Sequence, residues 1–277
     1  MRKSDRVRRI NSAVMTALTA TCTVLAVGAL LIILGYIAWQ GIGSLNFQFL
    51  IDRPRPVGEG GGIGNAILGS LLLLSISSVI GLPLGICVGV YLSEIGSGRM
   101  AGAVRFIVDT LTGIPSIVTG VFVYTILVLP MKHFSALAGG VALAMIMIPI
   151  VARTTEEMLK LVPHSMREGA LALGAPQWRV TFGVIVPAAA PGIATGAMLA
   201  IARISGETAP LLFTAFGSRF FPTSLNEPIA SLTVQIYNYA ISPYDEWHAQ
   251  AWAATLVLMT LVLGINIAVR FLTRKRF

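Results

Sequence analysis

Long stretches without a charged residue constrain this chain more than any other feature of its sequence. Uncharged segments cover residues 10–51, 60–93, 110–131, 134–152, 180–202, 208–218 and 249–269. A helix needs about 20 apolar residues to cross a bilayer, and most of these segments reach or approach that length. Only 12% of the residues are charged and the mean hydropathy is +0.81, whereas a soluble domain carries roughly 25% charged residues. The sequence therefore excludes a soluble enzyme and a disulfide scaffold and predicts a polytopic membrane protein.

These segments predict an all-α fold with six transmembrane helices. We expect the helices near residues 15–39, 65–92, 108–131, 136–152, 185–216 and 250–270. The fifth is too long for one straight span and is interrupted by charge, so we expect it to contain a break. Glycines spaced four apart, at Gly81, Gly85 and Gly89, should allow another helix to pack closely against the second one.

The distribution of Lys and Arg predicts that both termini are cytoplasmic. In that orientation, fifteen of these residues lie on the inner side of the membrane and four on the outer side, as the positive-inside rule requires. The inner residues are Arg2, Lys3, Arg6, Arg8, Arg9, Arg99, Arg105, Arg153, Lys160, Arg167, Arg179, Arg270, Arg274, Lys275 and Arg276. The outer residues are Arg53, Arg55, Lys132 and Arg219. Membrane topology thus accounts for the net charge of +8 without nucleic-acid binding.

The longest predicted cytoplasmic segment, residues 153–184, contains a short helix with a specified start and end. Ser165 and Glu168 have the spacing of a capping box, in which each side chain bonds the other residue's amide. Gly174 can adopt the left-handed conformation that ends a helix, and Pro176 prevents its continuation. So short a helix is marginal in water and needs a surface to dock on. That surface could be the membrane or a cytoplasmic partner.

The same segment resembles the EAA loop of bacterial ABC importer permeases, E-A-A-x3-G-x9-I-x-L-P. Here Glu168-Gly169-Ala170 precedes Gly174, and Val184-Ile185-Val186-Pro187 follows at the family spacing. Gly169 replaces the first alanine of the pattern. The resemblance implies that residues 163–187 form a coupling segment whose helix docks on an ATP-binding subunit. The residues assigned to this role are Ser165, Glu168, Gly169, Ala170, Gly174 and Pro187.

Further segments resemble phosphate-specific permeases. These are residues 111–118, 149–157 and 167–175. Residues 203–215 and 241–247 are similar to the A-type subunit (PstA family) rather than to its C-type sibling. The resemblance implies a type-1 ABC permease fold over residues 64–270, preceded by a tail, helix and outer loop at 1–63 and followed by a basic tail at 271–277.

The partners that the resemblance implies are those of a phosphate importer. They are a C-type sibling permease, an ATP-binding subunit dimer, a phosphate-binding protein on the outer face, inorganic phosphate and membrane lipid. The expected location is the bacterial cytoplasmic (inner) membrane. No role for nucleic acid is implied.

Arg203 and Glu207 lie within the fifth predicted transmembrane helix, where lipid or protein should surround them. Ionisable residues at membrane depth are costly and are functional candidates by default. They lie four residues apart, on one face of a continuous helix, although Gly206 and Pro210 favour a local break. Arginine suits a tetrahedral oxyanion because its planar fork can hold two oxygens. The two side chains could line the substrate path, or they could form a structural ion pair that neutralises both charges. The family resemblance favours a role in the path.

Arg153 and Glu156, at the inner end of the fourth helix, form a second candidate set. They resemble family positions linked to translocation. An arginine at the inner end is also what the positive-inside rule predicts, and pairing with an acid three residues on is ordinary. Both interpretations therefore stay open.

The chain lacks the motifs of an ATPase or a metalloenzyme. None of its four lysines follows a glycine, so there is no P-loop, and His133, His164 and His248 are isolated in the sequence. We therefore predict no enzymatic activity, cofactor or metal, with ATP hydrolysis on a separate subunit. The alternatives are a permease for another oxyanion, such as sulfate or molybdate, a gradient-driven secondary carrier with Glu207 as proton relay, or a purely regulatory membrane subunit.

Overall fold

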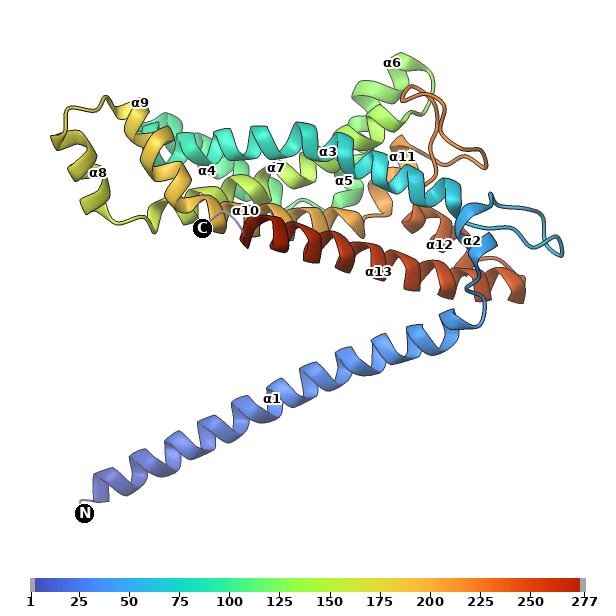
Figure 1. Ribbon diagram of the computed structural model, residues 1–277, viewed down its shortest axis with the longest axis horizontal. Coiled ribbons are helices and arrows are strands. Elements are labelled where there is room, and N and C mark those ends of the chain that lie inside the picture. The colour runs from blue at the N-terminus through green and yellow to red at the C-terminus, as the bar shows by residue number, and fades with distance from the viewer. Residues whose placement is uncertain (1–2, 275–277) are drawn as a thin grey trace.

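A computed structural model describes residues 3–274, and helices joined by mostly short connections dominate it (Figure 1). The helical elements in chain order are α1 (Lys3–Ile42), α2 (Phe47–Ile51), α3 (Gly64–Val90), η1 (Tyr91–Ile95), α4 (Gly98–Gly113), α5 (Ser116–Val123), η2 (Tyr124–Val128), α6 (Leu129–Met131), α7 (Ala136–Lys160), α8 (His164–Ala172), α9 (Gln177–Val180), η3 (Thr181–Ile185), α10 (Val186–Ser205), α11 (Ala209–Thr214), α12 (Leu232–Ala240) and α13 (Asp245–Arg274). The three η elements are π-helical turns. The predicted all-α fold is confirmed. Of the predicted basic tail at 271–277, residues 271–274 continue α13 and residues 275–277 lie outside what the structure describes.

Five helices of the described chain are long and apolar enough to cross a membrane. They cover residues 8–42, 64–95, 136–160, 177–205 and 245–268. A bent pair of helices can supply a sixth span, which gives up to the six that the sequence predicts.

The third predicted helix, residues 108–131, is not one helix. The chain bends by 106° between α4 and the helix that begins at Ser116. Pro115 explains the bend, because proline disfavours a helical conformation in the residue before it. Ile114 accordingly has extended angles of φ −71° and ψ 131°. The prediction of a single span from 108 to 131 is therefore wrong.

Two other predicted helices differ at their ends. The fourth, predicted to stop at 152, continues as α7 to Lys160 and so includes Glu156. The fifth breaks at residues 206–208, between α10 and α11, as the sequence predicts. Pro210 stands in the first turn of α11, where its missing N–H costs no helical hydrogen bond.

The centre of the molecule is the packing of α3 against α7. A Cβ atom at Gly81, Gly85 or Gly89 would lie only 2.5–2.8 Å from side-chain atoms of α7. Those atoms belong to Met147, Val151 and Thr155. The predicted role of these glycines in close helix contact is confirmed.

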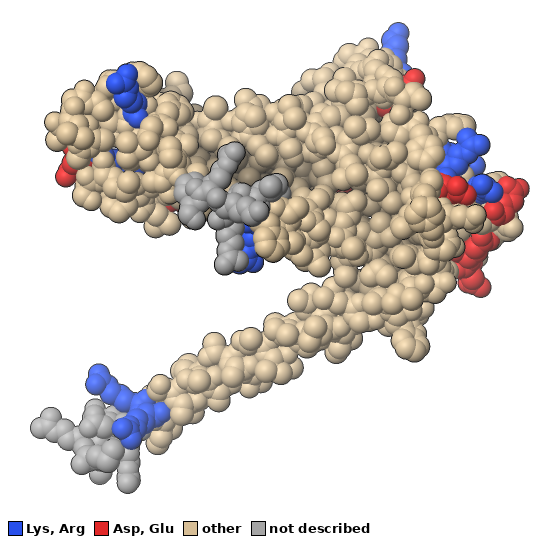
Figure 2. Space-filling model, in the orientation of Figure 1, with Lys and Arg blue, Asp and Glu red and all other residues tan. Residues whose placement is uncertain are grey.

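The helices are aligned roughly along one direction, with charged side chains gathered near the two ends. On the visible face, Lys, Arg, Asp and Glu leave a broad uncharged band between the ends of the molecule (Figure 2). Helix α8, the beginning of α1 and the end of α13 all lie toward the left end in Figure 1. Helix α1 diverges from the body and contacts α13 near its own C-terminal end, where Tyr36 meets Trp252 edge to face at 5.3 Å.

Candidate transport path and coupling helix

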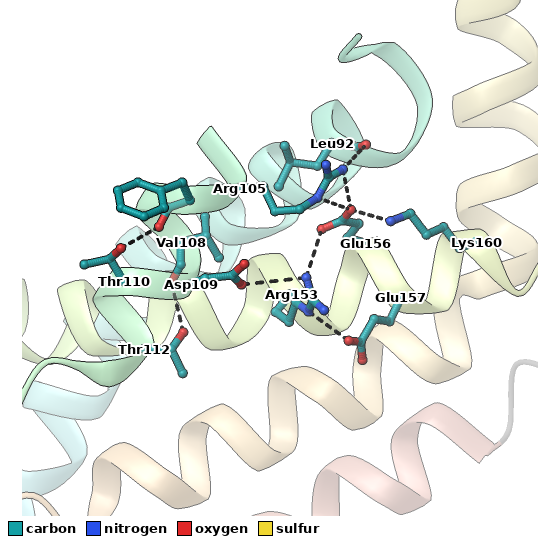
Figure 3. A network of polar contacts seen from close by, with 11 residues as sticks. Leu92, Arg105, Val108, Asp109, Thr110, Thr112, Arg153, Glu156, Glu157 and Lys160 are labelled. Carbon is teal, nitrogen blue, oxygen red and sulfur yellow. Dashed lines mark hydrogen bonds and ion pairs between the residues drawn. The ribbon is translucent and has the colours of Figure 1, made fainter. Parts of the chain in front are cut away.

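Glu156 is the centre of a polar network near the C-terminal end of α7. Its side chain is only 1% exposed, and a buried carboxylate needs charged or hydrogen-bonding partners. Its Oε1 accepts hydrogen bonds from Arg105 at 3.0 Å (Nε) and 2.8 Å (Nη2), and from Lys160 at 2.5 Å (Figure 3). Because Arg105 belongs to α4, this network joins α4 to α7.

Arg153 lies beside this centre and has three acidic neighbours. Its Nε donates to Glu157 at 2.8 Å. Its Nη1 lies 3.7 Å from Asp109 and 3.9 Å from Glu156 Oε2 (Figure 3). The predicted pairing of Arg153 with Glu156 is therefore present but peripheral, since the closest contacts of each residue go elsewhere.

Arg105 is the member of this network that the sequence does not reveal. Its position only indicates the cytoplasmic side of the membrane. Its role depends on how α4 lies against α7, which no local pattern specifies. One weak local signal is Asp109, one helical turn beyond Arg105.

Arg203 and Glu207 form a direct ion pair at the end of α10. The arginine side chain is 56% exposed while the glutamate side chain is only 6% exposed. The backbone at the break is fixed from another element, because the Thr233 hydroxyl donates to the Glu207 carbonyl at 2.8 Å. In the described part of the chain, no ion pair joins this set to the network around Glu156.

The short helix that the sequence predicts before Gly174 exists as α8, but its start differs from the prediction. Ser165 lies inside the helix, Pro163 is the N-cap residue, and no side chain caps the end. The predicted capping box is therefore wrong. The physical reason is that Pro163, at φ −55° and ψ 138°, already has a conformation suited to the residue before a helix.

The end of α8 is as predicted. Gly174 has a φ of +79°, and the Ala175 amide donates back to the Ala170 carbonyl at 3.3 Å, which is the pattern of a left-handed helix end. No residue of α8 is buried. Leu173, directly after the helix, is 89% exposed, so the loop presents apolar surface. Pro187 stands in the first turn of α10.

The sequence also does not reveal the ion pair that joins α8 to the other helices. Arg167 of α8 bonds Glu94 of η1, 73 residues away in the chain, at 2.8 Å. A contact between residues so distant in sequence follows from the tertiary arrangement and has no local signature.

A cavity of about 370 Å³ opens at the opposite end of the molecule from α8. Its lining includes Pro54, Arg55, Ser218, Arg219, Gln235 and Asn238. Tyr239 and Trp247 stack beside it at 5.0 Å. Burial raises the pKa of the Tyr239 hydroxyl, and the nearby Glu246 acts in the same direction.

Comparisons with known proteins show which family the chain belongs to. Residues 81–277 match the family described as binding-protein-dependent transport system inner membrane component. The chain belongs to this family. It is therefore one inner-membrane component of a larger transport system, and the predictions of a transport component rather than an enzyme and of a resemblance to PstA permeases are confirmed.

Relatives similar over nearly the whole chain share one name. A phosphate transport system permease protein PstA from Yersinia pestis is 46% identical over 277 residues, which cover 99% of this chain and 94% of that protein. One from Haemophilus influenzae is 43% identical over 95% of this chain and 94% of that protein. A probable PstA from Methanocaldococcus jannaschii is 37% identical, covering 97% and 96%.

Solved structures with the same fold are permeases of ABC importers. The MetNI methionine ABC transporter in an inward-facing conformation has a TM-score of 0.60 at 22% identity, covering 77% of this chain and 94% of that chain. A bacterial ABC transporter for import of the acidic polysaccharide alginate has a TM-score of 0.66 at 15% identity, covering 97% and 99%. At these identities the likeness shows the fold, and it confirms the predicted ABC importer permease fold.

Proposed function

We propose that this chain is the A-type permease subunit of an ATP-driven importer of inorganic phosphate. With a homologous C-type sibling it encloses the transmembrane path, using residues 64–270 as its permease core. The observation that carries the proposal is 46% identity, over 99% of the chain, to a permease protein of a phosphate transport system.

Arg203 is the proposed phosphate ligand inside the path. A guanidinium fork can hold two oxygens of a tetrahedral anion and stays charged at any physiological pH. The side chain is more than half exposed, whereas its partner Glu207 is buried. An arriving phosphate can therefore replace the carboxylate on Arg203, and Glu207 can later displace the phosphate. This exchange gives binding and release without leaving the arginine unpaired.

Arg153 is the proposed second station, near the inner end of the path. It is partly exposed and surrounded by acidic groups, so the same exchange of carboxylate for phosphate can occur there. Glu156 keeps the surrounding cations in place, because its own side chain is buried between Arg105 and Lys160.

Helix α8 is the proposed coupling helix. Its unburied residues and the exposed Leu173 support docking in a groove of an ATP-binding subunit dimer. We assign Ser165, Glu168, Gly169 and Ala170 to the docking face, and Gly174 and Pro187 to the shape of the segment. Closure of the ATPase dimer then moves α8 and, through it, the helices of the path.

The proposed orientation of the chain in the membrane follows from the distribution of Lys and Arg between the two ends of the molecule. The α8 end, with both termini, faces the cytoplasm, in line with the excess of Lys and Arg assigned to that side. A phosphate-binding protein then docks at the opposite end, where Arg55 and Arg219 line an open cavity. Arg55 is already paired with Asp52 at 3.1 Å, so Arg219 is the cation of this lining that would attract an arriving anion.

Uptake of radiolabelled phosphate by cells that express the complete transporter tests this function. Arg203→Gln should abolish uptake while the assembled complex persists in the membrane, and Arg203→Lys should retain part of it. Uptake should stop on ATP depletion with the proton gradient intact. Normal uptake by Arg203→Gln would remove this residue from the path, and loss of uptake only with an uncoupler would favour the secondary carrier. Competition by sulfate or molybdate tests the alternative anions.

A further inference from the structure

Arg167 is held by four hydrogen bonds that join α8 to two other helices. Its Nη2 and Nε donate to the Glu94 carboxylate at 2.8 and 3.3 Å. Its Nη2 also donates to the Leu159 carbonyl and its Nη1 to the Val162 carbonyl, both at 2.8 Å. One guanidinium thus connects α8 to η1, at the end of α3, and to the inner end of α7.

Glu94 is bonded by residues of α8, of α9 and of its own helical turn η1. The Ser93 hydroxyl donates to its carboxylate at 2.8 Å, and the Gln177 side chain of α9 donates to its backbone carbonyl at 3.3 Å. Glu94 and Arg167 are only 9% and 18% exposed. Poor access for water strengthens an ion pair, and a two-point contact fixes its direction as well as its distance.

In the described part of the chain, no other side chain of α8 makes a hydrogen bond or ion pair with the rest of the protein, although His164 also acts electrostatically on Glu94. Glu168, beside Arg167, is exposed. Arg167 is therefore the polar link through which a displacement of α8 reaches α3 and α7. The link ends on η1, and single π-helical turns are frequent at functional sites.

We propose that Arg167 and Glu94 are positioning residues that transmit motion of the coupling helix to α3 and α7. The proposal rests on the assignment of α8 as the coupling helix. Glu168 and its neighbours face the ATPase, whereas Arg167 faces inward and converts docking into movement of the path helices. Loss of the link should leave the ATPase attached and active but make each hydrolysis event less productive.

The test compares phosphate uptake with ATP hydrolysis in proteoliposomes that contain the complete transporter. Glu94→Gln keeps the shape of the side chain and removes its charge. Uptake per ATP hydrolysed should fall about fivefold or more, the lower end of ordinary coupling between sites, while the ATPase subunit co-purifies normally. Arg99→Gln is the matched control, because Arg99 is an exposed arginine near η1 for which the structure gives no ion pair. It should leave the ratio unchanged.

A covalent link separates transmission from simple structural support. In a background with Cys22 and Cys87 replaced by Ser, Glu94→Cys with Arg167→Cys should uncouple the transporter. Bridging the two thiols with a short bis-maleimide should restore uptake per ATP, whereas a mono-maleimide should not.

Two results would overturn the proposal. The first is a normal ratio in Glu94→Gln. The second is a parallel loss of ATPase attachment, hydrolysis and uptake that bridging does not reverse, which would mark the pair as structural. Failure of the proposed function looks different, since the unmodified transporter would then show no ATP-driven phosphate uptake at all.

Discussion

Replacing Glu156 by Gln should destabilise the protein far more than the same change at Glu157. The Glu156 side chain is 1% exposed and bonds two cations, whereas the Glu157 side chain is 51% exposed and bonds only Arg153. Removing one partner of a fully buried ion pair costs about 3–5 kcal/mol. Arg105 and Lys160 are partly exposed and can regain water, and the amide oxygen still accepts a hydrogen bond, so we expect roughly 2 kcal/mol for Glu156→Gln.

The neighbouring variant gives the reference value. An exposed ion pair contributes about 0.5 kcal/mol or less, so Glu157→Gln should be nearly silent. In a chain of this size a loss of 2 kcal/mol corresponds to a fall in apparent Tm of about 4–8 °C. The Glu157 variant should lose no more than about 2 °C.

Thermal unfolding of the purified transporter in detergent, followed by size-exclusion chromatography of the soluble fraction, measures both values. The two variants and the parent chain are heated at one rate, because unfolding of a membrane protein is often irreversible. Equal shifts for the two variants would contradict this expectation, since they would show that burial of Glu156 does not determine its contribution to stability.

Two further predictions concern glycines. Gly85→Ala should lower the yield of folded protein, because the new Cβ would lie 2.7 Å from Val151 and overpacking costs about 1–3 kcal/mol. Gly102→Ala in α4 is the control: its Cβ would meet nothing within 4 Å, so the yield should not change. Gly174→Ala forces a left-handed alanine at a cost of about 1 kcal/mol, so ATPase co-purification should fall about fivefold, whereas Gly174→Asn should retain it. Equal yields at 85 and 102, or equal co-purification of the two Gly174 variants, would contradict these expectations.

The sequence predicts those features that depend on local composition or on one special residue. Apolar length gives the transmembrane helices, Gly174 gives the end of α8, and the charge near Gly206 indicates a broken helix. The same reasoning fails where two local rules compete. Ser165 satisfies the spacing of a capping box, but Pro163 starts the helix earlier, and Pro115 bends a segment whose composition alone indicates one continuous span.

The partners of the candidate site residues could not be predicted for a different reason. Arg105 and Glu94 contact residues 51 and 73 positions away. Such contacts depend on how the helices pack, and a basic residue at the inner membrane face is expected whether or not it has a partner. The family resemblance identifies residues that lie within its motifs. Arg105 and Glu94 both lie outside the segments that carry the resemblance.

The contacts around α7 indicate which parts of the protein should move together. Three glycines of α3 pack against α7. Arg167 bonds η1 at the end of α3, the Leu159 carbonyl of α7 and the Val162 carbonyl just after α7. Glu156 ties α4 to the same helix. Because packed interfaces resist small continuous deformation, α3, α7 and the inner end of α4 should follow α8 as one body. Helix α10 packs on α7 in the same way, because Cβ atoms at Gly192 and Gly196 would clash with the side chains of Met158 and Thr154. Helix α10 should therefore move with this body, and Arg203 should keep its position relative to α7.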